Sequence, residues 1–384
     1  MDRSLPIYLD NAATTRVVPE VEAVVHACMA EDFGNPSSAH HMGIAAEARV
    51  RVARDQLLAA IADDGGRAGE VYWTSGGTES DALAVIGAAR ARAGRGKHIV
   101  FCAIEHPAVR ESARKLQSEG WRVTEVQVEQ SGAVDPERFC DAVEDDTTVA
   151  ALMLVNNEIG TVMPVAQVAR SLRASRRRVH IHCDAVQALG KVPIDVVELG
   201  ADSVAFAAHK IHGPKGVGAL WLRKGARVAP MWSGGGQQAG VRSGTLNVPG
   251  IAGLGKAAEL ATATLEATRA RFGEFEAALL SAADSAGVSW RRNGAGAPRA
   301  PHVVSLAFDG IPAEPLLHVL ESRGVLVSAG SACAERDRKP SPVLSAIGLP
   351  ESFGTVRLSF GRETTADHVQ EAARILVEAV QSLS

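Results

Sequence analysis

A lysine stands where an apolar run stops, in the stretch AFAAHKIHGPKGVGAL at residues 205–220. Lys210 is followed by a turn rich in glycine and proline and then by a second apolar run. Ordering a lysine side chain costs entropy, and its charge is costly to desolvate. The residue can be an exposed turn lysine, or an amine held at a strand end for covalent chemistry. Polar residues elsewhere in the chain distinguish these interpretations.

Polar side chains also follow other apolar, β-branched segments. They are His106, Asn156, Asn157, Asp184, Gln187 and His209. Each alone fits a cap, a turn residue or a satisfied core group. Ligands of open α/β sheets bind beyond the carboxyl ends of the strands. Here four successive strand ends present acid, amide, imidazole and amine groups to one edge, which predicts a pocket.

The stretch TSGGTES at 74–80 leads from a strand directly into a helical pattern. Glycines let backbone N–H groups approach an anion, and a helix N-terminus favours negative charge, so this stretch predicts a phosphate site. It is not a P-loop, because no Gly-Lys-Ser/Thr follows. The alternative is a plain N-cap at Ser75 or Thr78, with Glu79 in the first turn.

A lysine, a strand-end carboxylate, a histidine and a phosphate cradle together meet the requirements of pyridoxal 5'-phosphate (PLP). The lysine forms an imine, and the carboxylate keeps the pyridine nitrogen protonated so that the ring accepts electrons. An imidazole can stack on the ring. In this interpretation Lys210 is placed for imine chemistry, and its glycine-rich flank allows close backbone approach.

Two other patterns point to different cofactors and are weaker. SGGGQQAG at 233–240 has a G-x-G-x-x-G-like spacing, but it neither ends a strand nor opens a helix. It therefore gives only weak support for a nicotinamide oxidoreductase. HIHCD places His180, His182 and Asp184 on one face of a strand. We expect no metal there, because His180 lies near the start of the strand, away from the ligand edge.

Cys333 differs in setting from the other four cysteines. Cys28 and Cys140 fall in helical patterns, and Cys102 and Cys183 fall in buried strand patterns, where cysteines behave as small hydrophobes. Cys333 lies in SAGSACAERDRKPSP, a run of small residues leading into a charged loop, as an accessible nucleophilic thiolate requires. It can instead be a surface cysteine without a role. Beside a PLP site, it predicts chemistry on sulfur.

The elements that would position these residues alternate between strands and helices, which is typical of a mainly parallel sheet. The expected strands are 70–75, 98–106, 149–157, 179–186, 203–209 and 218–222, with helices such as 79–93 and 108–120 between them. After about residue 250 the pattern changes to a long helix at 250–286, short strands at 302–308, 324–328 and 355–360, and a helix at 365–383. This second part predicts a smaller α+β domain.

Length and composition agree with a two-domain α/β enzyme. The chain has 384 residues, of which 46% are hydrophobic and 4% aromatic, and its net charge is −4. That balance argues against direct nucleic-acid binding. We expect no membrane segment, and the scattered, odd-numbered cysteines suggest reduced thiols in a cytoplasmic protein.

Ten short motifs, in order and spacing, resemble those of the PLP-dependent cysteine desulfurases, within the class V aminotransferase group of fold type I. They are YLDNAATT, FGNPSS, TSGGTESD, EHPAV, VNNEIG, DAVQ, AHKIHGPKG, RSGT, GSAC and VRLSFGR. The resemblance covers the chain essentially end to end. It implies a mainly parallel seven-stranded sheet with helices on both faces and a smaller α+β C-terminal domain. The large PLP-binding domain would be 15–255, and 1–14 with 256–384 would form the small domain carrying the cysteine loop.

The resemblance also implies roles for single residues. Lys210 would be the Schiff-base lysine, His106 the ring-stacking and proton-handling histidine, and Asp184 the partner of the pyridine nitrogen. Gln187 would lie near the ring hydroxyl, and Cys333 would become a persulfide. The expected phosphate contacts are Gly77, Thr78 and His209, with Thr245 given across a dimer interface. The substrate carboxylate and its surroundings would be held by Asn35, Arg357 and Asn157, the last also beside the cofactor.

The chain departs from the usual pattern of these enzymes in three places. Ala207 stands where a serine is common, which removes one phosphate hydroxyl worth about 1 kcal/mol. Ala82 replaces a common asparagine, and Gln238-Ala239 replaces Glu-Arg. The loop after Cys333 has the long form of the housekeeping-type subgroup.

The implied activity is conversion of L-cysteine to L-alanine by a homodimer, with the sulfur passed from Cys333 to an acceptor protein. Iron–sulfur assembly, tRNA thiolation and DNA sulfur modification all draw on such enzymes. Alternatives are a selenocysteine lyase, another class V PLP enzyme acting on a small amino acid, and a non-catalytic scaffold for sulfur transfer.

Overall fold

The computed structural model describes residues 6–330 and 341–384, so Cys333 lies outside the described residues. Its largest sheet has seven strands in the order β2-β8-β7-β6-β5-β3-β4. The run from β7 to β4 is parallel, whereas β8 is antiparallel to both of its neighbours. The strands are β2 (Gly69–Thr74), β3 (His98–Cys102), β4 (Arg122–Val126), β5 (Thr147–Ala151), β6 (His180–Asp184), β7 (Ser203–Ala207) and β8 (Gly218–Arg223). The predicted mainly parallel seven-stranded sheet is confirmed.

Helices on both faces explain why the central strands are buried throughout. Every residue of β3, β5, β6 and β7 is buried, as expected for parallel strands covered on two sides. One face packs Ile99 and Phe101 against α3 and α4, and the other packs Val100 and Ala150 among the residues of α2, α6 and α8. These helices are α2 (His41–Ala60), α3 (Gly77–Ala91), α4 (Pro107–Ser118), α6 (Val165–Ala174) and α8 (Val248–Ala263).

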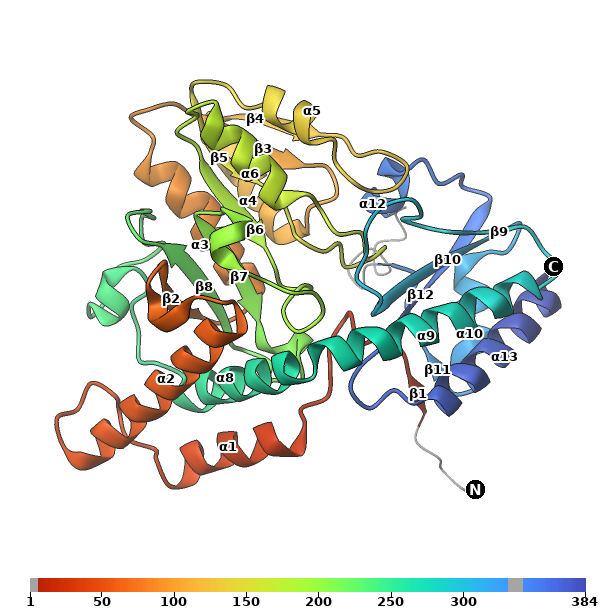
Figure 1. Ribbon diagram of the computed structural model, residues 1–384, viewed down its shortest axis with the longest axis horizontal. Coiled ribbons are helices and arrows are strands. Elements are labelled where there is room, and N and C mark those ends of the chain that lie inside the picture. The colour runs from red at the N-terminus through yellow and green to blue at the C-terminus, as the bar shows by residue number, and fades with distance from the viewer. Residues whose placement is uncertain (1–5, 331–340) are drawn as a thin grey trace.

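A second, smaller sheet lies at the other end of the molecule (Figure 1). It is antiparallel, with strand order β12-β10-β9, and its core joins Phe308, Leu358 and Phe360 to α9, α10 and α13. Strand β1 pairs in parallel with β11 beside this unit. The elements are β1 (Ile7–Tyr8), α9 (Leu265–Asp284), β9 (Trp290–Arg292), β10 (Val303–Asp309), α10 (Ala313–Ser322), β11 (Val325–Leu326), β12 (Phe353–Ser359) and α13 (Ala366–Leu383).

Helices α8 and α9 connect the two sheets. Figure 1 shows them end to end, running from beneath the large sheet to the small one. The sequence pattern predicts one helix over 250–286, but the structure interrupts it at Thr264, which has a non-helical φ of −112° and ψ of 10°. Periodicity misses the break because apolar residues continue on both sides of it.

The strands end earlier than their apolar runs. β3 stops at Cys102 rather than at 106, and β5 stops at Ala151 rather than at 157, so His106 and Asn157 lie in the loops that follow. Apolar residues in those loops are buried against the sheet, which gives them a strand-like composition. Elements that the sequence pattern did not single out include α1 (Pro19–Ala30), α5 (Pro136–Asp141), α7 (Val196–Leu199) and α12 (Pro342–Ala346).

Candidate active site

Three predicted site residues meet beyond the carboxyl ends of the parallel strands. Asp184 is the last residue of β6, Lys210 ends the short 3-10 helix η2 (Ala208–Lys210) after β7, and His106 is the N-cap of α4. His106 and Asp184 lie with Asp81 of α3 in a group whose side-chain ligand atoms are all within 4.8 Å of one another. The edge of the sheet therefore collects imidazole, carboxylate and amine groups from three separate segments.

Lys210 contacts the N-terminal segment of the chain. Its Nζ donates to the carbonyl oxygens of Ala12 and Ala13, each at 2.7 Å. The Thr15 N–H donates to the carbonyl oxygen of His209 at 2.9 Å, which fixes this segment beside η2. The amine is half-buried and held at the strand end, so the exposed turn lysine is the wrong interpretation.

Burial perturbs both Asp184 and His106. It raises the pKa of the Asp184 carboxyl, while His106, the Val186 N–H and Lys210 act in the opposite direction. Burial lowers the pKa of the His106 imidazole. The Nδ1 of His106 accepts from the Ala108 N–H at 3.1 Å, so in the neutral ring the proton is on Nε2. The site thus holds an oriented neutral imidazole beside a carboxyl group.

Asp81 was missed by the sequence reasoning, although it follows the predicted phosphate stretch directly. Its Oδ1 lies 3.1 Å from the Nε2 of His182, and the Nδ1 of His182 lies 2.9 Å from the Ser203 Oγ. The same hydroxyl lies 2.8 Å from the Nε2 of His180. The two histidines therefore link Asp81 to the interior of the sheet, and burial lowers the pKa of each to about 3.

The predicted phosphate stretch forms one wall of a cavity of about 440 Å³. Its lining includes Ala13, Thr14, Ser75, Gly76, Gly77, Thr78, Glu79, His209, Lys215 and Gly216. Helix α3 begins at Gly77 after a Gly76 N-cap that has no side-chain hydrogen bond, so the plain cap at Ser75 or Thr78 is wrong. The first N–H groups of the helix therefore have no capping side chain to accept their hydrogen bonds.

Glycines keep this cradle open. A Cβ at Gly77 would lie 2.7 Å from the Val186 Cγ2, and one at Gly218 would lie 2.6 Å from the carbonyl carbon of Gly76. Glu79 in the first turn accepts from the Ser75 N–H at 2.7 Å and pairs with Arg242 at 2.8 Å, so its charge is already partnered.

These residues fit PLP. The uncapped start of α3 and its glycines suit a phosphate. Lys210 supplies an amine, and the buried Asp184 carboxyl suits a ring nitrogen that must stay protonated. The Nε2 of Gln187 donates to the carbonyl oxygen of Ala12 at 2.8 Å. The Lys210 amine donates to the same oxygen, so the two side chains lie close together.

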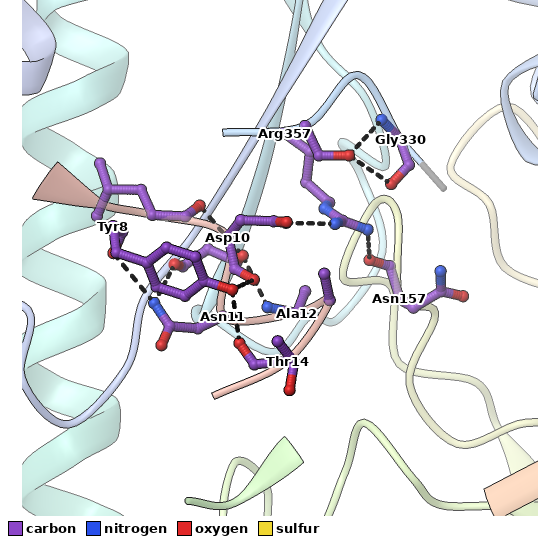
Figure 2. Close-up of polar contacts among 12 residues, drawn as sticks. Tyr8, Asp10, Asn11, Ala12, Thr14, Asn157, Gly330 and Arg357 are labelled. Atoms are coloured by element: carbon purple, nitrogen blue, oxygen red, sulfur yellow. Dashed lines mark hydrogen bonds and ion pairs between the residues drawn. The ribbon is translucent and has the colours of Figure 1, made fainter. Parts of the chain in front are cut away.

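Arg357 lies at a second polar centre, shown in Figure 2. Its Nη2 is 2.7 Å from the Asp10 Oδ1, and its Nη1 donates to the carbonyl oxygen of Asn157 at 3.0 Å. The arginine side chain is only 2% exposed. The sequence predicts that Arg357 holds a substrate carboxylate, but it did not predict that Asp10 already supplies a carboxylate to this arginine. Asp10 lies in the motif YLDNAATT, which was the available signal.

The remaining predicted residues do not reach this pocket in the single chain. Asn35 lies exposed between α1 and α2, where its Oδ1 accepts from the Ser37 N–H at 2.9 Å. Thr245 is also exposed, and neither residue lines the cradle cavity.

Comparisons with known proteins agree with this geometry. The family model Aminotransferase class-V matches residues 7–371. "Cysteine desulfurase IscS" of Methanosarcina thermophila is 40% identical over 98% of this chain and 92% of its own, and its namesake in Anaeromyxobacter sp. (strain Fw109-5) is 41% identical over 99% and 93%. Among solved structures, a "NifS-like protein" shares 33% identity with a TM-score of 0.90, covering 99% of this chain and 100% of that one. DndA from Streptomyces lividans shares 36% identity with a TM-score of 0.76, covering 92% and 99%.

The lysine pocket, the parallel sheet and the end-to-end match show that the chain belongs to the class-V aminotransferase family, whose members here have fold type I. Within that family it belongs to the PLP-dependent cysteine desulfurases. No helix in 6–330 or 341–384 has the length and apolar character to cross a bilayer.

Proposed function

We propose that this enzyme takes sulfur from L-cysteine, releases L-alanine, and carries the sulfur as a persulfide on Cys333 to an acceptor protein. The observation that carries the proposal is the convergence of Lys210, Asp184 and His106 beside a glycine-rich cradle. The non-catalytic scaffold is disfavoured, because a scaffold has no need for a buried carboxyl and an oriented imidazole around a lysine amine.

The cofactor would be held by residues from three segments, the start of α3, the end of β6 with the loop after it, and η2. Gly77, Thr78 and His209 would contact the phosphate, Asp184 the ring nitrogen, and Gln187 the ring hydroxyl. Bound PLP supplies an electron sink for the charge that develops at the substrate Cα. Burial and the neighbouring lysines lower the pKa of His209 to about 4, so this imidazole is neutral at pH 7 and adds no charge to the phosphate site.

Protons would be moved by Lys210 and His106. The two carbonyl oxygens that accept from the Lys210 Nζ hold this amine beside the N-terminal segment, next to His209 of the cradle lining, and there it would remove the proton from the substrate Cα. The Nε2 proton of His106 is directed away from the Ala108 N–H and can be given to a neighbouring group.

The substrate carboxylate would bind at Arg357, together with Asn157. Since the Asp10 carboxylate already pairs with the Arg357 Nη2 at 2.7 Å, an incoming carboxylate competes with Asp10 or binds a different N–H of the guanidinium. The Nε of Arg357 is buried and has no hydrogen-bond partner among the described residues, so it is the available donor.

Sulfur transfer would use Cys333, and the four described cysteines support this choice. Burial raises the pKa of each of the thiols of Cys28, Cys102, Cys140 and Cys183, which keeps them protonated and poorly nucleophilic. In the proposed step the Cys333 thiolate attacks the substrate sulfur. A sulfur–sulfur bond forms, the Cβ–sulfur bond breaks with its electron pair left on the carbon fragment, and protonation of that fragment yields alanine.

We also propose a cytoplasmic homodimer. Thr245 and Asn35 are exposed and lie outside the cradle of their own chain, which supports contributions to the partner's site. Sedimentation should give a dimer. Thr245→Ala should weaken PLP binding even though Lys210 of the same chain is still present. A fully active monomer would contradict this arrangement.

The central experiment is Cys333→Ala, with Cys140→Ala as the matched cysteine control. The Cys333 variant should bind PLP and keep its yellow colour, and its absorbance should still change when cysteine is added. It should form no alanine or sulfide, because no thiolate remains to accept sulfur. Wild-type protein exposed briefly to cysteine should gain one sulfur on the peptide containing residue 333, measured by mass spectrometry, and Cys140→Ala should do the same.

Alanine release at the parent rate by Cys333→Ala would overturn the persulfide step. Extra sulfur on Cys28, Cys102, Cys140 or Cys183 would reassign the carrier. Selenocysteine turnover that persists in this variant while cysteine turnover is lost would favour the selenocysteine lyase.

A further inference from the structure

A second cavity lies away from the PLP cradle, at the junction of the two sheets. It measures about 30 Å³, enough for a water molecule or an ion of similar size, since one water needs roughly 10–15 Å³. Lys191, in the loop after β6, and His212, after η2, line one side, and Leu260, Thr264, Thr268 and Arg362 line others. None of its lining residues lines the cradle cavity.

Lys191 is the unusual member of this lining. It is only 7% exposed, yet no hydrogen bond or ion pair involves its ammonium anywhere in the described parts of the chain. An ammonium removed from water is costly unless a counter-charge or acceptors replace the water. Burial lowers the pKa of Lys191 to about 8, and Arg271 acts in the same direction, so no carboxylate offsets the charge.

The groups around Lys191 are also positive or neutral. Burial, with Lys191 nearby, lowers the pKa of His212 to about 4, and both of its ring nitrogens are engaged, with the Arg16 carbonyl oxygen and the Arg362 N–H. The Arg362 guanidinium pairs with Glu20 on the exposed side. The Arg271 Nε is buried and has no hydrogen-bond partner among the described residues.

We propose that this cavity binds a small monovalent inorganic anion, such as chloride, against the Lys191 ammonium. Thr268 belongs to the lining, with its hydroxyl 3.4 Å from that of Thr264, and the exposed Thr264 marks the entrance. The other walls are apolar, formed by residues such as Val18, Ile211 and Phe272. Such walls and so small a volume disfavour sulfate or phosphate, which need more room and more donors.

An ion here would connect the two parts of the fold. Lys191 and His212 belong to loops of the large sheet, whereas Arg362 follows β12 of the small sheet. Binding to the folded state alone should therefore raise the unfolding temperature in a saturable way.

The test is thermal unfolding of the full-length, PLP-loaded enzyme at constant ionic strength, with gluconate replaced stepwise by chloride. Wild type should show a saturable rise on the order of 2 °C. Lys191→Met should lose this rise, whereas Lys224→Met, at an exposed lysine of the large sheet, should keep it. A bromide-soaked crystal of wild type should show an anomalous peak within about 3.5 Å of the Lys191 Nζ, a readout that does not depend on a folded variant.

Absence of a chloride effect in wild type, or its retention in Lys191→Met, would overturn the proposal. So would a crystal with no halide beside Lys191. A larger Lys191-dependent rise with sulfate than with chloride would contradict the monovalent class.

Discussion

At the residue scale, burial raises the pKa of the Asp184 carboxyl, whereas the His106 imidazole, the Val186 N–H and the Lys210 amine act in the opposite direction and favour its charged form. Asp184→Asn keeps an acceptor for the Val186 N–H but cannot carry that charge. We expect kcat to fall at least ~100-fold, as for other groups that stabilise charge in a buried site. Alanine formation and the visible absorbance of bound PLP measure the effect.

Glu105→Gln is the matched control for this prediction. Glu105 is also buried, its Oε1 accepts from the Met153 N–H at 2.6 Å, and burial and the neighbouring Asp184 raise its pKa. This variant should retain most of the rate and the spectrum. Equal losses in both variants would mean that buried charge in general, and not Asp184, controls the reaction.

Ala207 permits a prediction of increased affinity. It ends β7, and its Cβ lies 3.6 Å from the position that a Cβ on Gly77 would take, so a hydroxyl there would border the phosphate cradle. Ala207→Ser should strengthen PLP binding about 5-fold, the equivalent of one hydrogen bond worth ~1 kcal/mol. Titration of the apoenzyme with PLP measures the Kd.

Ala205→Ser, two residues earlier on the same strand face, tests whether position matters. It buries a hydroxyl away from the cradle and should leave the Kd for PLP unchanged while lowering stability. If Ala207→Ser binds PLP no more tightly than wild type, the phosphate does not lie against the end of β7.

At the element scale, the edge strand β2 is held by a side chain from a distant loop. The Gln238 Oε1 accepts from the Trp73 N–H at 2.6 Å, and its Nε2 donates to the carbonyl oxygens of Trp73 and Arg242. Gln238→Ala should lower the free energy of unfolding by ~1–3 kcal/mol, because it leaves backbone groups of β2 without partners. Chemical denaturation measures this loss.

Gln237→Ala is the neighbouring control. Its side chain accepts one hydrogen bond, from the Gly244 N–H at 2.8 Å, so the loss should be smaller. If the two variants are equally destabilised, the contact of Gln238 with β2 contributes no more to the free energy of unfolding than the contact of Gln237 with Gly244. Gln238 also adopts a left-handed φ of 50°, which a glycine would relieve, so Gln238→Gly should be less harmful than Gln238→Ala.

The elements of the large sheet could be predicted because mostly apolar strands alternate with helical patterns, and polar residues mark the carboxyl ends of these strands. The polar pairs that complete the site could not. Asp10 meets Arg357 across 347 positions, and Asp81 meets His182 across 101, so no local pattern reveals either contact. The helix break at Thr264 was hidden for the opposite reason, since apolar periodicity continues through it.

At the scale of the whole molecule, the junction between the sheets should make stability depend on pH. Lys191 has a pKa near 8 in the folded protein against about 10.5 when exposed, so between these values the unfolded chain binds more protons. Stability of wild type in gluconate should therefore rise as pH increases from 8 to 10 by more than in Lys191→Met. Denaturation at several pH values measures the difference, and parallel curves would contradict the buried ammonium.

The division into 15–255 and 1–14 with 256–384 stays a prediction, which limited proteolysis can test. We expect first cuts in the connections between the two hydrophobic cores rather than within the parallel sheet. Protected fragments ending inside β5, β6 or β7 would contradict it.

The first strand has a consequence for how the enzyme is made. Ile7 pairs with Val325, Asp10 pairs with Arg357, and the carbonyl oxygen of Ala12 accepts from Lys210. This segment must therefore wait for partners that are made some 350 codons after it, roughly 20 to 70 s at about 5–20 residues per second. The contact of Asp10 with Arg357 is therefore made after the parallel sheet and Lys210 have been synthesised.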